Sequence, residues 1–255
     1  MTGRFHARGG WGYRFGGMRC PAPVWAAALA VAAIAAAALP SGARPGTPAQ
    51  PPASSFSARV DNPWYPLLAG STYVYRGRKD GKSARDVMTV TRSVARIDGV
   101  PCVVVRDRLW LDGRLEERTT EWYSQDAGGN VWYFGEDTAE LDTHGRVTNT
   151  DGTWRAGRGG GRAGLFMFAR PRVGRAAQQE YARGQAADHF AVLALNATAR
   201  SPYVTSKRAL LTKEWTPLEP GVVDHKLYVR GVGTVLEKTV RGGDEQLALV
   251  SFRRM

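Results

Sequence analysis

Residues 101–134, PCVVVRDRLWLDGRLEERTTEWYSQDAGGNVWYF, decide the fold. Three runs rich in β-branched and aromatic residues are separated by two turn signals, Asp112-Gly113 and the DAGG of 126–129. Asp-Gly is a strong hairpin dipeptide, because both residues tolerate the positive φ that a type I′ turn requires. Within 115–125 polar side chains recur along the run, which indicates a sheet with one solvated face. The stretch therefore predicts two consecutive antiparallel hairpins.

The same pattern continues on both sides of this stretch. Upstream, Ser71–Arg76 precedes a turn at 79–82, and Asp86–Ile97 leads into the hairpin dipeptide Asp98-Gly99. Downstream, further strands are expected at 138–143, 146–154, 176–182, 188–198, 207–215, 224–230, 233–241 and 246–253. No helical periodicity lasts more than about two turns, and the sequence contains no convincing internal repeat.

A meander of about a dozen strands cannot stay flat, because a flat sheet of that size exposes its edges and one apolar face. We therefore predict a mainly β fold, in which a single antiparallel sheet of consecutive hairpins curves strongly into a half-barrel or barrel. The glycine-rich stretch 157–174 is expected to be irregular, with its apolar run Leu165–Phe168 folding over the open side of the sheet.

The first 43 residues have the layout of a secretory signal. They contain arginines and no acidic residue, and the uncharged run Val24–Leu39 is followed by Pro40 and the small residues of 41–43. This run is short against the roughly 20 residues of a membrane span. We expect a signal helix in residues 1–43, which is either cleaved after Ala43 or retained as an anchor, with Met18 as an alternative start. Membrane contact is expected only through this segment, if it is uncleaved.

The rest of the chain divides into two parts. Residues 44–60 are rich in Pro, Ser and Ala and predict a linker, and residues 61–255 have an ordinary length for one β domain. The expected location is secreted or extracytoplasmic, in the cell envelope. Cys20 precedes the apolar run, so it is not the lipidated cysteine of a lipoprotein signal. Cys102, among valines, is expected to be buried in a strand.

The composition is basic, with 35 Lys and Arg against 23 Asp and Glu and a formal net charge of +12. A basic surface favours anionic partners, such as an anionic envelope polymer or lipid headgroups. No nucleic-acid partner is expected, because the chain is predicted to be exported and contains no recognisable nucleic-acid-binding module.

The common catalytic and cofactor motifs are missing or lack their structural context. Gly159-x-Gly161-x-x-Gly164 matches the dinucleotide fingerprint, but that motif needs a strand before it and a helix after it. No G-x-S-x-G, H-E-x-x-H, C-x-x-C or P-loop sequence occurs. Asp188-His189 and Asp224-His225 offer metal ligands only if members of both pairs meet on neighbouring strands, because adjacent strand side chains point to opposite faces. We expect no catalytic residue, metal or cofactor.

Aromatic residues concentrate on one predicted hairpin, where Trp122-Tyr123 faces Trp132-Tyr133-Phe134. Two interpretations are open: cross-strand packing, and a concave aromatic-lined pocket with a few polar groups. The functional interpretation assigns this pocket to Trp122, Tyr123, Trp132, Tyr133 and Trp215, with Glu136 or Arg170 orienting a polar head. The expected ligand is an apolar or amphiphilic envelope molecule, such as a lipid or glycolipid, bound without catalysis.

Two other classes of function stay open. One is an extracellular carbohydrate-active hydrolase, which needs two carboxylates flanking a glycosidic bond. Its candidate carboxylates are Glu121, Glu136, Glu214, Glu219 and Asp224. The other is a structural or partner-binding envelope protein, whose aromatic residues form only a core and whose partner surface is an exposed apolar patch.

Three phrases of the sequence resemble a family of exported bacterial proteins of uncharacterised function. They are DNPWYPLLAGSTYVYRG (61–77), EWYSQDAGGNVWYFGED (121–137) and KEWTPLEPGVVDHKLYVRGVGTV (213–235). The resemblance covers nearly all of 61–255 and implies an exported single domain, but no activity and no site residues. At the level of the fold, it also suggests similarity to the half-barrel carriers of lipids and lipoproteins.

Overall fold

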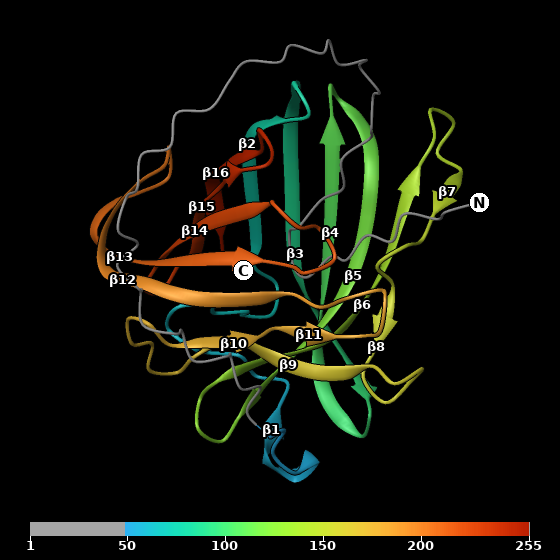
Figure 1. The fold of residues 1–255 in the computed structure, drawn as a ribbon, viewed down its shortest axis with the longest axis vertical. Coiled ribbons are helices and arrows are strands. Elements are labelled where there is room, and N and C mark those ends of the chain that lie inside the picture. The colour runs from blue at the N-terminus through green and yellow to red at the C-terminus, as the bar shows by residue number, and fades with distance from the viewer. Residues whose placement is uncertain (1–48, 255) are drawn as a thin grey trace, which may run out of the picture.

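The computed structural model describes residues 49–254, so the predicted signal helix and cleavage site lie outside the described residues. The described part consists almost entirely of strands (Figure 1). The elements are a 3-10 turn η1 (Ala53–Ser55), β1 (Phe56–Ser57), β2 (Thr72–Lys79), β3 (Lys82–Ile97), β4 (Val100–Leu111), β5 (Arg114–Asp126), β6 (Val131–Leu141), β7 (Val147–Asn149), β8 (Trp154–Arg155), β9 (Arg162–Met167), β10 (Ala176–Gln178), β11 (Glu180–Tyr181), β12 (His189–Arg200), β13 (Thr205–Trp215), β14 (Val223–Val229), β15 (Gly233–Arg241) and β16 (Gln246–Arg253). Among these residues no helix has the length and apolarity that a membrane span needs.

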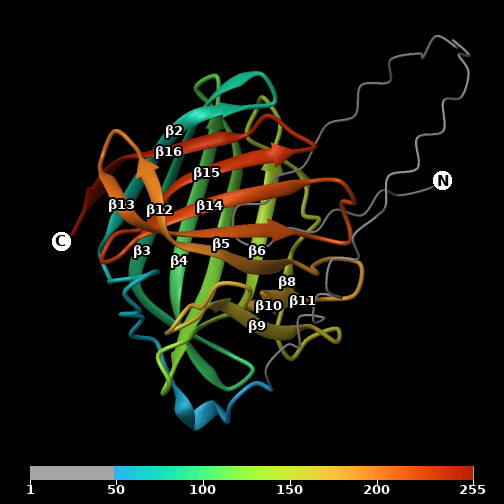
Figure 2. The ribbon, with the colours of Figure 1, turned by 60° about the vertical axis from the view of Figure 1, so that its left-hand side comes forward.

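The strands form one antiparallel sheet in the order β10-β12-β13-β14-β15-β16-β2-β3-β4-β5-β6-β9-β11, with β1 beside β5 and with β7 and β8 beside β6. Most neighbours are consecutive hairpins, and the C-terminal β16 pairs with β2. Figures 1 and 2 show the sheet curling round until it is nearly closed. The predicted fold, a strongly curved antiparallel half-barrel or barrel, is confirmed.

The turn chemistry that indicated the hairpins is present in the backbone. Asp80, Asp98 and Asp112 all have positive φ, and each is followed by a glycine with positive φ. This is the conformation of a type I′ turn, which matches the right-handed twist of the flanking strands. The β2–β5 wall therefore follows directly from its local sequence.

The stretch 157–174 differs from the prediction, because part of it is a strand. β9 pairs with β6, where Leu165 opposes Trp132 and Gly164 opposes Tyr133, and β9 also pairs with β11. The run Leu165–Phe168 is buried inside the sheet instead of covering its open side. Glycines before the run and Pro171 after it are typical of a loop, so the sequence did not predict this short strand. The strand is stabilised by pairing with β6, which lies far away in the chain, and not by an alternation of polar and apolar residues.

The two ends of the sheet meet at a seam. β10 is the last strand at one end of the sheet order and β11 the last at the other, and only Gln179 separates them in the chain. β10 also lies against β9. The seam therefore brings short strands from both sheet ends together.

The segment between β1 and β2 packs into the hollow of the sheet. Within it, Asn62 donates to the carbonyl of Gly129 (2.8 Å) and accepts from the backbone N–H of Trp64 (2.8 Å). Residues at the end of the predicted linker, Phe56 and Val60, are already buried. The DNPWYPL phrase is thus a plug that is fixed to the hairpin end of β5–β6.

Charge is sorted between the two faces of the sheet. Eleven of the 23 acidic side chains are buried, whereas only Lys79 and Lys226 of the 30 basic side chains in residues 49–254 are. The outer surface is consequently more basic than the composition indicates, and the inner face is acidic.

Candidate functional site

The predicted aromatic hairpin exists, but its side chains divide between the two faces of the sheet. In the register of β5 and β6, Tyr123 opposes Tyr133 and Ser124 opposes Trp132. Tyr123 and Tyr133 point inward and stack, with ring centroids 4.7 Å apart. Trp122 and Trp132 lie on the opposite face, because successive strand residues alternate. The aromatic side chains of this hairpin are therefore shared between the inner and the outer face of the sheet.

The outward aromatics are covered by other parts of this chain. Trp132 donates its indole N–H to Asp126 (2.8 Å) and lies edge-on to Phe56, with ring centroids 6.0 Å apart. The guanidinium of Arg155 lies 4.3 Å from the centre of the Trp122 ring. Trp122 and Trp132 are both buried, and these contacts are the cross-strand and covering packing of the first interpretation.

The inward aromatics form a filled core. Tyr65, from the plug segment, lies 5.6 Å from Tyr123, 4.6 Å from Phe166 and 6.4 Å from Tyr228, measured between ring centroids. These four rings are almost completely buried. The side chains of the protein itself therefore occupy the aromatic part of the hollow.

The other predicted site residues lie apart from one another. Glu136 is buried on the inner face opposite Glu121, and Arg170 is exposed in the connection after β9. Trp215, at the end of β13, stacks on His189 with ring centroids 5.5 Å apart. Among the seven predicted residues the structure places Tyr123, Tyr133 and Glu136 on the inner face and Trp122 and Trp132 on the outer face, with Arg170 and Trp215 apart from both groups.

The aspartate–histidine pairs do not assemble a metal centre. His189 opposes Trp215, whereas His225 opposes Lys213, so the two imidazoles occupy different register positions. Within residues 49–254 no three His, Cys, Asp or Glu side chains are grouped to hold a metal ion. Cys102 is buried as expected, and burial raises the pKa of its thiol to about 12.

The inner face carries a set of buried acidic side chains. Glu121 accepts hydrogen bonds from the hydroxyls of Tyr123 (2.8 Å) and Tyr133 (3.4 Å). Burial, reinforced by the charge of Asp107, raises the pKa of Glu121 to about 8. Burial likewise raises the pKa of Asp86 and Glu237. Burial therefore favours the protonated, uncharged state of Glu121 and Asp86, whereas Glu237 also contacts the ammonium of Lys226, which opposes its protonation.

One group of buried charges is paired. Lys226 contacts Glu214 at 2.8 Å and Glu237 at 3.5 Å, and the hydroxyl of Tyr228 donates to Glu214 at 3.2 Å. A buried ammonium without such partners would be strongly disfavoured. These residues therefore form a network of hydrogen bonds and ion pairs in the interior of the sheet.

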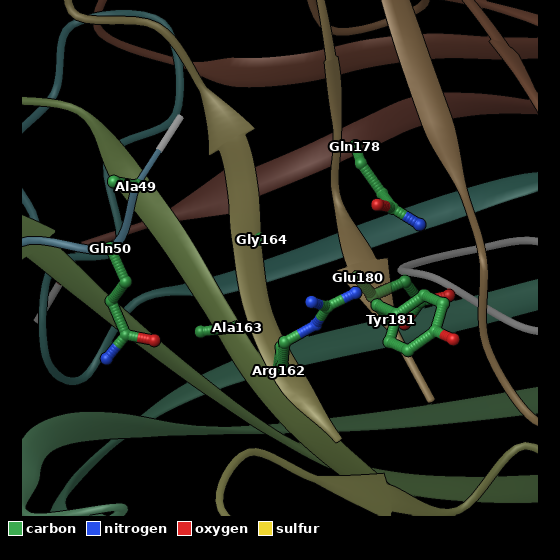
Figure 3. A pocket seen from close by; sticks show the side chains of 8 residues that line it. All are labelled: Ala49, Gln50, Arg162, Ala163, Gly164, Gln178, Glu180 and Tyr181. Carbon is green, nitrogen blue, oxygen red and sulfur yellow. The ribbon is translucent and has the colours of Figure 1, made fainter. Parts of the chain in front are cut away.

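A pocket opens at the seam between the two sheet ends (Figure 3). Its volume is about 260 Å³, and it is lined by Ala49, Gln50, Arg162, Ala163, Gly164, Gln178, Glu180 and Tyr181. We call it the seam pocket. β9 and β11 supply one wall and Gln178 of β10 comes from the other sheet end. None of the seven predicted site residues lines it.

Glu180 is the fully buried acid of the seam pocket. Its Oε2 accepts a hydrogen bond from the Trp154 indole N–H (2.8 Å), while its Oε1 is buried without a hydrogen-bond partner among the described residues. Burial, followed by the nearby charges of Asp188 and Glu136, raises the pKa of Glu180 well above its ordinary value. Burial thus favours the protonated form of this carboxyl, and one of its two oxygens makes no hydrogen bond among the described residues.

The mouth of the seam pocket combines an aromatic ring with a cation. Arg162 is exposed, and its guanidinium lies 4.3 Å from the centre of the half-buried Tyr181 ring. In Figure 3 the side chain of Arg162 lies beside that of Tyr181, its register partner, whereas Glu180 opposes Ala163 and therefore points to the buried face of the same strands. The lining thus offers the donors of Arg162 and the ring of Tyr181 on the exposed side of β9 and β11, and the carboxyl group of Glu180 on their buried side.

Gly164 explains part of the glycine pattern in 157–164. A Cβ atom at this position would lie 2.3 Å from the backbone carbon of Gln179 and 2.6 Å from the carbonyl oxygen of Gln178. Only glycine lets β9 pass this close to the β10–β11 chain. The third glycine of the apparent fingerprint thus closes the seam and does not bind a nucleotide phosphate through the usual strand–turn–helix.

One feature of the sequence indicates this pocket, a group of polar residues within a predicted strand. Gln178-Gln179-Glu180-Tyr181 places three polar residues inside a predicted strand, at 176–182. An acid in a short strand is a candidate for burial with a function. The partner wall, β9, was not predicted, so the pocket could not be assembled from the sequence.

The hydrolase alternative gains no support at this pocket. Glu180 is the one acid among its lining residues, whereas glycosidase chemistry requires two carboxyl groups flanking the bond. Of the candidate acids, Glu121 opposes Glu136 and Glu214 opposes Asp224 in neighbouring strands. Glu121, Glu136 and Glu214 are buried in the wall of the sheet and do not line the pocket.

Comparisons with known proteins give fold-level matches alone. No protein-family model matches the chain, and no curated protein matches it. A Bacteroides fragilis structure, described as an exported protein with a YmcC-like fold, aligns with a TM-score of 0.44 and 13% identity over 75% of this chain and 99% of its own. A Parabacteroides distasonis structure, described as a lipoprotein, aligns with a TM-score of 0.40 and 9% identity over 74% and 98%. The function is therefore argued from the residues of this chain.

Proposed function

We propose that this protein is an exported, non-enzymatic β domain that binds an amphiphilic molecule of the cell envelope and holds its uncharged, sugar-type headgroup in the seam pocket. The observation that carries the proposal is Glu180, whose buried Oε1 has no partner among the described residues at a 260 Å³ pocket. A buried polar atom without a partner costs about 1–3 kcal/mol, so a ligand that supplies the missing hydrogen bond is favoured.

The charge state of Glu180 selects the kind of headgroup. Because burial raises its pKa well above the ordinary value, the protonated form of the carboxyl is favoured, and that form both donates and accepts hydrogen bonds. The guanidinium of Arg162 at the mouth repels cationic groups and donates to oxygen atoms. Gln178 adds an amide to the lining. Hydroxyl groups of a sugar match this mixture of donors and acceptors better than a charged group does.

The size of the pocket limits what enters it. A volume of about 260 Å³ lies below the roughly 300–1,000 Å³ of pockets that enclose drug-sized ligands. The interior next to it is filled by Tyr65 and the rings that surround it. We therefore place the headgroup in the pocket and the apolar part of the ligand outside it.

Extraction of the purified protein tests the proposal. The full chain is expressed with its predicted signal, and the molecules that accompany it are measured by native mass spectrometry and by solvent extraction. We expect a stoichiometric glycolipid with the wild-type protein. An exposed turn acid serves as the control, in the variant Asp80→Asn, which should retain the same amount of ligand.

Two substitutions at Glu180 separate an uncharged headgroup from a cationic one. Glu180→Gln replaces the protonated carboxyl by an uncharged amide of the same shape, whose oxygen can accept from Trp154 while its NH2 group donates, so it should retain the ligand. Glu180→Leu removes both functions and should reduce retention at least about tenfold. Because Glu180→Leu also removes the acceptor of Trp154, Arg162→Ala at the exposed mouth provides a second test that leaves the core intact. Loss of ligand with Glu180→Gln would indicate a charged headgroup, and full retention with both Glu180→Leu and Arg162→Ala would exclude the seam pocket.

A further inference from the structure

The outer face of the β2–β5 wall carries a group of arginines that we call the arginine face. It comprises Arg76 on β2, Arg85 on β3, Arg106 and Arg108 on β4, and Arg118 on β5, all of them exposed. Their neighbours in the chain, Asp86 and Asp107, point to the inner face and are buried. The alternation of strand residues thus separates the acids of this wall from its arginines.

The register places like charges directly opposite each other. Arg76 opposes Arg85 in the β2–β3 pair, and Arg108 opposes Arg118 in the β4–β5 pair. Like charges in such positions destabilise a sheet. This arrangement is an energetic cost that the fold itself does not require, because any polar residue suits an exposed strand position.

No ion pair within residues 49–254 relieves this repulsion. None of the five arginines takes part in a salt bridge of the described chain. On the adjacent strand β6, Asp137 opposes Thr120 of β5. Its carboxylate pairs with Arg155 at 3.4 Å. Two of the arginines have a local interaction: the guanidinium of Arg85 lies 4.7 Å from the centre of the Trp110 ring, and the charge of Arg108 acts on the buried Asp107. The positive charge of the face is therefore not neutralised by any salt bridge among the described residues.

The rest of the surface does not compensate it either. Among residues 49–254, 28 basic side chains are not buried, whereas only 12 acidic side chains are not buried. An incoming anion therefore meets a positive field at the arginine face, which raises its local concentration.

We propose that the arginine face binds a flexible, phosphate-bearing polymer of the cell envelope. Arginine matches phosphate well, because its planar guanidinium donates two parallel hydrogen bonds. Neighbouring strands are about 4.8 Å apart and alternate residues of one strand about 6.8 Å apart, so the five guanidinium groups form a continuous band. A linear polyanion can contact all of them at once.

The shape of the wall favours a polymer over a lipid bilayer. The arginine face is the convex side of a strongly curved sheet (Figures 1 and 2). A flexible chain can follow a convex surface, whereas a flat bilayer touches it along a narrow strip. The apolar residues of this face, Val74, Val87 and Trp110, are half-buried between the arginines and offer no exposed side chain for insertion.

The experiment measures binding of fluorescently labelled long-chain inorganic polyphosphate to the full-length purified protein over a range of salt concentrations. The test variant is Arg76→Gln/Arg108→Gln, and the control is Arg200→Gln/Arg208→Gln, which removes the same charge from exposed positions on β12 and β13. Melting temperatures are recorded for both. Because the test variant relieves like-charge repulsion, a loss of binding cannot be attributed to unfolding if its melting temperature is unchanged or raised.

The expected results are quantitative. Each phosphate contact contributes about −0.7 to the slope of log K against log salt, so five contacts give about −3.5 and the test variant about −2.1. We expect at least about a tenfold loss of affinity in the test variant at low salt, and less than about a twofold loss in the control.

Equal losses in both variants would mean that net charge alone binds the polymer, which overturns the proposal. Binding to anionic phospholipid vesicles without binding to polyphosphate would also overturn it, in favour of a membrane surface. The seam pocket takes no part in either outcome, so this test is independent of the proposed function.

Discussion

Glu121 makes the stability of this protein sensitive to pH, and the direction follows from its surroundings. Its side chain is buried on the inner face, with 2% of the residue exposed, and its pKa is raised from an ordinary value of 4.5 to about 8. The main cause is burial, followed by the charge of Asp107, against which the hydroxyls of Tyr123 and Tyr133 act. The folded protein therefore retains a proton that the unfolded chain releases.

The sign of the effect is determined by this difference. A carboxyl group whose pKa is raised by folding contributes its full stabilisation below the pKa of the unfolded chain and loses it as the pH rises towards the folded pKa. Each pH unit in this window costs about 1.4 kcal/mol for one group. Between about pH 5 and pH 7.5, Glu121 should therefore reduce the free energy of unfolding by about 3 kcal/mol.

The variant Glu121→Gln isolates this contribution. The amide oxygen can still accept the hydrogen bonds from Tyr123 and Tyr133, and the side chain no longer titrates. We expect stability within about 1 kcal/mol of wild type near pH 5, and a gain of about 2–3 kcal/mol relative to wild type near pH 7.5. Urea unfolding at four pH values from 5 to 8, followed by tryptophan fluorescence, measures the difference.

Other buried acids, including Asp86 and Glu237, add to the pH dependence of the wild type, so the difference between the two proteins is the quantity to compare. Asp80→Asn, in an exposed turn, is the control and should leave the pH dependence unchanged. If Glu121→Gln and wild type lose stability in parallel from pH 5 to 8, Glu121 is not protonated in the folded protein and the reasoning fails.

Two predictions concern packing. Tyr65→Ala empties the centre of the inner aromatic core and should cost about 3–5 kcal/mol of unfolding free energy in urea, whereas Tyr203→Ala, at a residue that is 42% exposed, should cost less than about 1 kcal/mol; equal losses would show that Tyr65 does not plug the hollow. Gly164→Ala places a Cβ atom 2.3 Å from the backbone of Gln179 and should destabilise the protein by at least about 1–3 kcal/mol and expose the seam to limited proteolysis. A Gly164→Ala protein with wild-type melting temperature and cleavage pattern would show that the strands at the seam do not cross so closely.

The hairpin wall was predictable because its determinants are local. Asp98-Gly99 and Asp112-Gly113 specify turns whose geometry fixes both the register and the direction of the flanking strands. The number of strands then requires curvature, since a flat sheet of this size leaves edges and an apolar face exposed. β9 was missed for the opposite reason. It is six residues long, is flanked by turn-forming residues and pairs with β6, more than 20 positions earlier in the chain.

For the aromatic hairpin the sequence predicts the strands but not what packs against their side chains. The sequence correctly placed Trp122-Tyr123 and Trp132-Tyr133-Phe134 on the two strands of one hairpin, but not the register that sets Tyr123 opposite Tyr133. It did not show that Tyr65 occupies the space next to them, because a loop residue gives no periodic signal of the side chain it will contact. The assignment of a ligand to these aromatics stays a prediction, while the structure directs attention to Glu180 and the seam pocket.

The sequence by itself determined the class of fold, the hairpins, the excess of basic residues and the absence of the common catalytic motifs, since all of these depend on composition or on neighbouring residues. The tertiary structure alone decided which charges face inward, what fills the hollow and where the sheet ends meet. Those properties arise from contacts between residues far apart in the chain, and the burial that results changes the chemistry of the groups involved. Glu121 and Glu180 are ordinary acids in the sequence, and burial raises their pKa values only inside the curved sheet, where the protonated form is favoured.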